Sequence, residues 1–185
     1  AYELVQRRFQ VVHKAAGLLG TTPEALTEKA EALLEDLNAS RKLITNLRES
    51  LTASEFEGAL KKTVEVNGVH VLAASLSEAN ADTLRLMVDR FRQLYPQMSV
   101  ILLGSAPEKR PVLIAAVSDD LVKGGLHAGE LVKAAALPLG GSGGGRPNLA
   151  QAGGKDATKM PEALGLVADW VQKQLNREDT NHRPG

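Results

Sequence analysis

A glycine-rich stretch, "LPLGGSGGGRPNLAQAGG" at residues 137–154, carries the side chains in this sequence best suited to binding a ligand. Arg146, Asn148, Gln151 and Lys155 supply hydrogen-bond donors within or just beside the glycines. Glycines let another backbone or a flat ligand approach closely, so such a surface could lie against bases or sugars while the cations reach phosphates. The glycines could instead serve only to let a helix pack closely on a sheet, and residue types alone favour neither interpretation.

Two nucleotide-binding patterns do not fit this stretch. Gly140 and Gly145 have the spacing of a phosphate-binding loop, but Arg146 and Pro147 replace the lysine and the hydroxyl residue that such a loop needs. A dinucleotide-binding Gly-x-Gly-x-x-Gly pattern also fails, because its third glycine would fall at Arg146. A flexible linker is disfavoured too, since apolar residues flank the glycines and only one short helix follows them.

Composition excludes several other chemistries. The chain of 185 residues has no cysteine, which rules out disulfides, thiolate metal sites and a cysteine nucleophile. The four histidines are scattered without metal-ligand spacing, and we expect neither a catalytic nor a metal site. Aromatic residues are 3% of the chain, too few to predict a platform for stacking single-stranded bases. No segment resembles a signal peptide or a membrane span, so we expect a cytoplasmic protein without a membrane partner.

Residues 1–58 are predicted to form an antiparallel helical hairpin of coiled-coil type. Apolar periodicity indicates helices over about 1–17 and 22–52, and Thr22-Pro23 fits an N-cap followed by proline at the first helical position. The second helix carries an apolar seam at heptad spacing, which either packs within the hairpin or joins two subunits. The seam residues proposed for helix packing or dimerisation are Leu26, Leu33, Leu37, Ile44, Leu47 and Leu51.

Residues 59–176 are predicted to form a globular α/β or α+β domain with a central sheet, and residues 177–185 a disordered tail. Asn67-Gly68 suits the tight turn of a hairpin, and Asn80 or Asp82 suits the start of a helix that ends before Pro96. The glycine-rich stretch is expected as a loop before the last helix, with a short strand within 148–153. The expected strands are 62–66, 69–75, 99–105 and 111–118, and the expected later helices 127–137 and 159–175.

The run "HAGELVKAAALPLGGSGGGRPNLAQAGG", residues 127–154, resembles the end of bacterial alanyl-tRNA synthetases. The resemblance extends upstream through "VSDDLVKGGL" and, more weakly, through the helical start. The same DHH-associated domain also ends a superfamily of phosphoesterases, where the glycine motif usually reads Gly-Gly-Gly-His. This sequence has Arg146 at that histidine and Ala-Gln-Ala-Gly-Gly downstream, and both departures favour the synthetase branch. It contains no Asp-His-His segment, so we expect no phosphoesterase chemistry.

The resemblance implies a non-catalytic C-terminal module that docks on the elbow of tRNA and helps aminoacylation and editing. It also implies that the rest of a synthetase chain is a partner and that the helical part can form a homodimer. The chain itself would need no cofactor, whereas the parent enzyme, an alanine–tRNA ligase, would use ATP, magnesium and zinc. Two alternatives stay open, a mainly structural or dimerising module and a single-stranded nucleic-acid-binding domain of a phosphoesterase.

The candidate tRNA-binding residues are the glycine motif and the polar or basic residues expected near it. They are Gly140, Gly141, Ser142, Gly143, Gly144, Gly145, Arg146, Asn148, Gln151, Lys155, Lys123, His127, Lys109 and Arg110.

Overall fold

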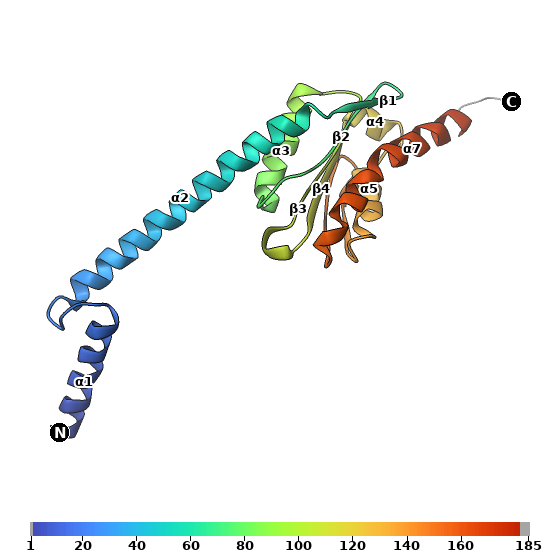
Figure 1. Ribbon diagram of the computed structural model, residues 1–185. Helices are drawn as coiled ribbons and strands as arrows, with labels where there is room; N and C mark the ends of the chain where they lie inside the picture. Colours follow the sequence, from blue (N-terminus) through green and yellow to red (C-terminus); the bar gives the residue numbers. More distant parts are fainter. Residues whose placement is uncertain (1, 182–185) are drawn as a thin grey trace. The chain divides into compact units, whose positions relative to one another are not determined.

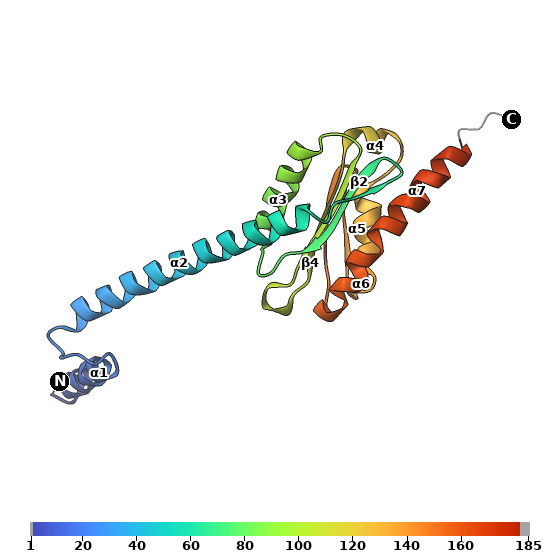
Figure 2. The ribbon, with the colours of Figure 1, turned by 45° about the horizontal axis from the view of Figure 1, so that its top comes forward.

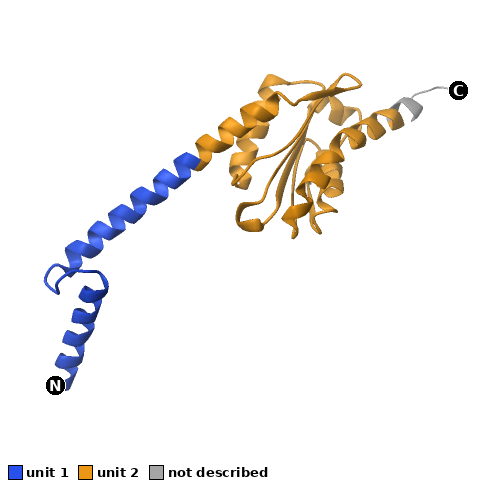
Figure 3. Ribbon diagram, viewed as in Figure 1, with its two compact units in different colours: residues 1–47 blue, residues 48–185 orange. Residues whose placement is uncertain are grey.

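The computed structural model describes residues 2–181 of the chain. They divide into two compact units, residues 1–47 and 48–185 (Figure 3). The division falls inside a long helix, so the helical segment and the globular domain share one continuous element. Within residues 2–181, none of the helices combines the length and the apolar character that a membrane span requires.

The first unit is helical. Helix α1 covers Tyr2–Leu18, and α2 covers Leu26–Leu60, of which the last part belongs to the second unit. Helix α2 therefore begins four residues after the predicted start and continues beyond the predicted end. Thr22 and Pro23 lie in the turn before α2, where the N–H of Ala25 donates to the carbonyl of Thr22 at 3.2 Å.

The apolar seam of α2 lies open. Its residues from Leu33 to Leu51 are exposed, Leu33 by 39% and Leu47 by 60% of their surface, and α1 buries only Ala16. The expected packing of an antiparallel hairpin is therefore not observed among the described residues, because a closed hairpin would cover this seam. The heptad pattern is real, but the chain by itself does not bury it.

The second unit is built on a six-stranded mixed sheet with the order β1-β2-β3-β4-β6-β5 (Figure 1). Strands β2 and β3 are parallel, and every other neighbouring pair is antiparallel. This arrangement confirms the predicted α+β class with a central sheet. The strands are β1 Val64–Val66, β2 Val69–Ser75, β3 Ser99–Ser105, β4 Val112–Val117, β5 Ser142–Arg146 and β6 Leu149–Gly153.

Helices cover both faces of the sheet (Figures 1 and 2). One face packs against α3 and the end of α2, which contributes Phe56. The other face packs against the remaining helices, with Leu131 and Val171 in its core. The helices of this unit are α3 Ala81–Leu94, α4 Asp119–Lys123, α5 Ala128–Ala136, α6 Met160–Gly165 and α7 Val167–Asn181.

The alternation of β3 explains the two cores. Val100 and Leu102 lie in the core beneath α5, whereas Ile101 and Leu103 lie in the core beneath α3, and all four are fully buried. A central strand covered on both faces needs a continuous run of apolar residues, which the four residues 100–103 of "SVILLGS" provide. The residues of β3 therefore place helices on both sides of the sheet.

Local signals in the sequence are confirmed at the turns and caps. Asn67 and Gly68 both have positive φ, 50° and 82°, between β1 and β2. The side chain of Asn80 caps α3 by accepting from the N–H of Thr83 at 2.8 Å. The strand expected within 148–153 is β6.

Three expectations for the second unit also differ from the structure. The closing helix is divided into α6 and α7 at Leu166, and α7 extends to Asn181 although a tail was expected from 177. The last four residues of that expected tail lie outside the described residues. The glycine-rich stretch is not a loop, because its centre, residues 142–146, forms the edge strand β5. Pairing with β6 holds this strand, and the low strand propensity of glycine did not indicate it.

Candidate nucleic-acid interface

Strands β5 and β6 form a hairpin around Pro147 and Asn148. Ser142 lies opposite Gly153, and Arg146 lies opposite Leu149. The turn is tied to the rest of the domain, since the carbonyl of Pro147 accepts from the N–H of Ala128 at 2.6 Å and that of Asn148 from the N–H of Val117. The glycine stretch is therefore a fixed strand at the edge of the sheet.

The glycines of this hairpin are required by close backbone contacts. A Cβ on Gly145 would stand 2.6 Å from the carbonyl oxygen of Leu149, and a Cβ on Gly143 would collide with Gln151 and Ala152. Gly154 is equally confined, because its Cβ would lie 2.6 Å from the Cβ of Leu139. The hairpin can form only with a nearly bare backbone.

Helix α5 covers one face of this bare hairpin. A Cβ on Gly129 of α5 would lie 3.6 Å from the carbonyl oxygen of Gly145, so the helix backbone approaches the strand closely. The packing interpretation of the glycines thus holds for this face. The other face and the outer edge remain open, because β5 is the last strand of the sheet in the described residues.

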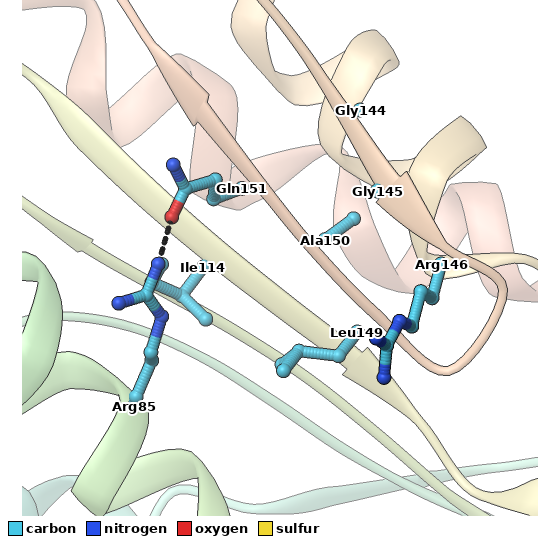
Figure 4. A pocket seen from close by; sticks show the side chains of 8 residues that line it. All are labelled: Arg85, Ile114, Gly144, Gly145, Arg146, Leu149, Ala150 and Gln151. Atoms are coloured by element: carbon cyan, nitrogen blue, oxygen red, sulfur yellow. Dashed lines mark hydrogen bonds between the residues drawn. The ribbon is translucent and has the colours of Figure 1, made fainter.

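A hollow of about 220 Å³ lies on the open face of the hairpin (Figure 4). It exists because α3 packs over β3 and β4 and leaves β6 and β5 uncovered. Its floor is formed by apolar side chains and glycine backbone, and an arginine stands at each end. The residues lining it are Arg85, Ile114, Gly144, Gly145, Arg146, Leu149, Ala150 and Gln151.

Gln151 holds Arg85 in this hollow. The guanidinium of Arg85 donates one hydrogen bond to the side-chain carbonyl of Gln151 and another, at 2.8 Å, to the carboxylate of Asp82. Gln151 lies opposite Gly144 in the hairpin, so no side chain on β5 stands beside it. Figure 4 shows Ile114 and Leu149 between Arg85 and Arg146.

Comparison with known proteins matches a family model, the DHHA1 domain, to residues 68–173, which is more than half of the chain. The chain belongs to the DHHA1 domain family. Residues 64–67 form strand β1 and its turn just before the match, and α7 extends beyond it. The resemblance predicted from residues 127–154 is thereby confirmed at the level of the family.

Nearly the whole chain, including the helical segment before its DHHA1 domain, is also similar to parts of alanine–tRNA ligases. It is 42% identical over 172 residues to that of Geobacillus kaustophilus and 38% identical over 175 residues to that of Bacillus subtilis. These matches cover 93% and 95% of the chain but only 19% and 20% of the relatives, so the chain spans about a fifth of their length.

A solved structure, the C-Ala domain from Aquifex aeolicus alanyl-tRNA synthetase, is similar in fold. It matches with a TM-score of 0.55 and 27% identity, over 60% of this chain and 97% of that one. Since the similarity covers nearly all of that domain, it agrees with the mixed sheet and helices described above.

The candidate residues of this DHHA1 domain fall into two groups, at opposite ends of the hairpin. The first group, at the turn, contains Arg146, Asn148, Lys123 and His127. Arg146 and Lys123 are exposed, whereas the amide of Asn148 donates to Asp119 at 3.3 Å. The Nδ1 of His127, just before α5, is buried and has no hydrogen-bond partner among residues 2–181.

The second group lies where β5 begins and β6 ends. Lys155 and Ser142 are exposed there beside a second hollow, which Gly140 and Gly141 also line. Lys109 and Arg110 belong to the β3–β4 loop at this same end of the sheet, because Val112 pairs with Gly153. Ser142 and Arg146 lie four positions apart on β5, which is about 13 Å, and Gln151 lies between the two groups.

Two cations near the hairpin were not expected from the sequence. Arg85 reaches the hollow from α3, and the Cε of Lys133 on α5 lies 3.9 Å from where a Cβ of Gly144 would stand. Both residues look like ordinary polar positions on amphipathic helices. The fold brings both cations to the glycines, because β5 packs beside α5 and β6 lies next to the strands that α3 covers.

Hydrogen bonds stabilise one carboxylate at each end of the hairpin. Burial raises the pKa of Asp120, but the neighbouring Ser118 hydroxyl and the Met98 N–H, which donates to its carboxylate at 2.8 Å, outweigh it and hold this pKa below its usual value. The Thr158 hydroxyl and N–H donate to Asp156 and lower its pKa as well. Both carboxylates are thus engaged with the fold itself.

Proposed function

We propose that this chain is the non-catalytic tRNA-binding module of an alanyl-tRNA synthetase, and that its β5–β6 hairpin docks on the elbow of tRNA. The observation that carries the proposal is a side-chain-poor edge strand with cations at both ends. Arg146 marks one end and Lys155 the other, with the hollow beside Arg85 between them. Backbone phosphates are bound by arginine and lysine, and a bare strand lets a ribose or base approach.

The similarity to the ligases supports the identity of the parent protein. The matched relatives are alanine–tRNA ligases, and the similar solved structure is the C-Ala domain of such an enzyme. The ligase activity, with its ATP, magnesium and zinc, would then belong to the remaining four-fifths of the protein. A cytoplasmic location follows from that parent.

Recognition by shape fits the surface better than recognition of bases. Trp170, the single tryptophan, is packed against the core, and none of the described residues that line the hollow has an aromatic ring for stacking. A folded RNA corner can be bound through phosphates and riboses without such rings. A weak contact of this kind becomes useful when it is linked to another tRNA site on the same enzyme, because the link raises its effective concentration.

The exposed seam of α2 supports a second role in dimerisation. Leu37 and Ile44 are exposed by 44% and 50% on a helix that the single chain leaves uncovered. Apolar residues repeated at heptad spacing are buried when a second helix packs on them. We propose that two copies pair through this seam.

A titration tests the main proposal. The chain is mixed with labelled full-length tRNA and, separately, with its acceptor-stem minihelix at two salt concentrations. We expect binding to the full tRNA alone, and we expect Arg146→Ala to weaken it several-fold and to reduce the salt slope by about one. Equal binding to both RNAs, or binding to neither, would exclude docking at the elbow by this chain.

A further inference from the structure

Arg85 is held in a defined orientation at the edge of the hollow. Its two terminal nitrogens each donate to a different acceptor, Gln151 on β6 and Asp82 on its own helix. A guanidinium has five N–H donors, of which these bonds use two. The side chain is still 44% exposed, so its remaining donors can reach a ligand.

The floor of the hollow beside Arg85 is apolar. Ile114 is buried, Leu149 is half-buried, and Gly144 adds only backbone. Among the described residues that line the hollow there is no carboxylate, and the two charged ones are both arginines. A phosphate ion alone would have no use for an apolar floor, whereas a nucleotide has both a charge and a flat apolar face.

We propose that this hollow is a subsite for one nucleotide of the bound RNA. Arg85 binds its backbone phosphate, and the nucleoside lies over Leu149 and the bare strand at Gly144. Gln151 is a positioning residue that acts through Arg85, in place of the direct RNA contact expected from the sequence. This inference rests on the proposed function, since it assigns a binding unit within the same hairpin.

The first experiment compares Arg85→Ala with Arg90→Ala in binding full-length tRNA. Arg90 is a matched control, because it lies on the same helix, is 48% exposed and also pairs with a carboxylate, that of Glu57, but does not line the hollow. We expect Arg85→Ala to weaken binding about fivefold to tenfold and to reduce the salt slope by about one. Arg90→Ala should change the affinity less than twofold.

A second variant separates charge from geometry. Arg85→Lys keeps the positive charge but loses the planar fork that bonds to Gln151 and Asp82. We expect an intermediate loss of affinity with an unchanged salt slope. Thermal melting of each variant, followed by circular dichroism, shows whether the domain remains folded.

A double-mutant cycle tests the role of Gln151. If Gln151 acts only through Arg85, Gln151→Ala weakens tRNA binding by the otherwise unmutated chain and has no further effect in the Arg85→Ala variant. Additive losses would show that Gln151 contacts RNA itself and would overturn its positioning role. If the unmutated chain binds tRNA and the Arg85→Ala and Arg90→Ala variants bind it with equal affinity, the subsite is overturned and the proposed function stands. If the unmutated chain binds no tRNA, both the subsite and the proposed function are overturned.

Discussion

Gly145 of β5 lies so close to Ala150 of β6 that a Cβ on Gly145 would stand 2.6 Å from the Cα of Ala150. The two residues are register partners in the edge hairpin, and helix α5 lies against the same strand. The glycine motif is therefore needed twice, for pairing with β6 and for packing beneath α5. Its open face remains available for a ligand for the same reason, the lack of side chains.

The first prediction concerns this contact. Gly145→Ala should lower the free energy of unfolding by about 1–3 kcal/mol, because the added methyl forces β5 away from β6. Urea denaturation measures the change. Gly58→Ala is the control, since Gly58 lies in α2 with open space around its Cα, and the same substitution there should stabilise the chain by about 0.5–1 kcal/mol. Equal effects at the two positions would refute the steric account.

The second prediction concerns acid stability. Although burial alone would raise the pKa of Asp120, it is held below 3.8, the value in the unfolded chain. The ionised Asp120 side chain therefore contributes fully to the free energy of unfolding above pH 3.8, and this contribution is lost as the pH falls through the folded pKa. Asp120→Ala should lower the free energy of unfolding by about 1 kcal/mol at neutral pH by removing the acceptor of the Met98 N–H.

The same variant should also flatten the acid limb of the stability curve below about pH 4, measured by urea denaturation at a series of pH values. Asp119→Ala is the matched control, because within residues 2–181 its carboxylate accepts only a 3.3 Å bond from Asn148. If the free energy of unfolding falls as steeply with acid in Asp120→Ala as in the unmutated chain, the prediction is contradicted.

The third prediction concerns the seam of α2. A chain carrying both Leu37→Glu and Ile44→Glu should sediment as a monomer at concentrations where the unmutated chain sediments as a dimer, because carboxylates buried between two helices oppose their pairing. Asn46→Glu adds a charge to the opposite side of the same helix and should leave the dimer intact. If the unmutated chain stays monomeric at all concentrations in sedimentation velocity, the seam does not pair two copies.

Local features of the fold could be predicted from the sequence. The turn at Asn67-Gly68, the cap at Asn80 and the apolar strand β3 each depend on neighbouring residues, and each is found as expected. The strand within 148–153 was also visible as a short apolar alternation. These signals survive in the fold because no distant contact opposes them.

Features that depend on distant contacts could not be predicted. Strand β5 has almost no side chains and hence no alternation, so its pairing with β6 decides its structure. Arg85 meets Gln151 across 66 residues of sequence, and nothing in the helix pattern distinguishes it from other exposed arginines. The heptad seam predicts that apolar residues share a face of α2, but periodicity does not say which helix covers them.

Docking at the elbow is tested most directly by hydroxyl-radical footprinting of full-length tRNA bound to this chain. The account predicts protected riboses at the outer corner of the tRNA and an unprotected acceptor stem, with the protection reduced in Arg146→Ala. Protection confined to the acceptor stem, or a footprint unchanged in Arg146→Ala, would contradict the assignment of the β5–β6 hairpin as the surface that binds the elbow.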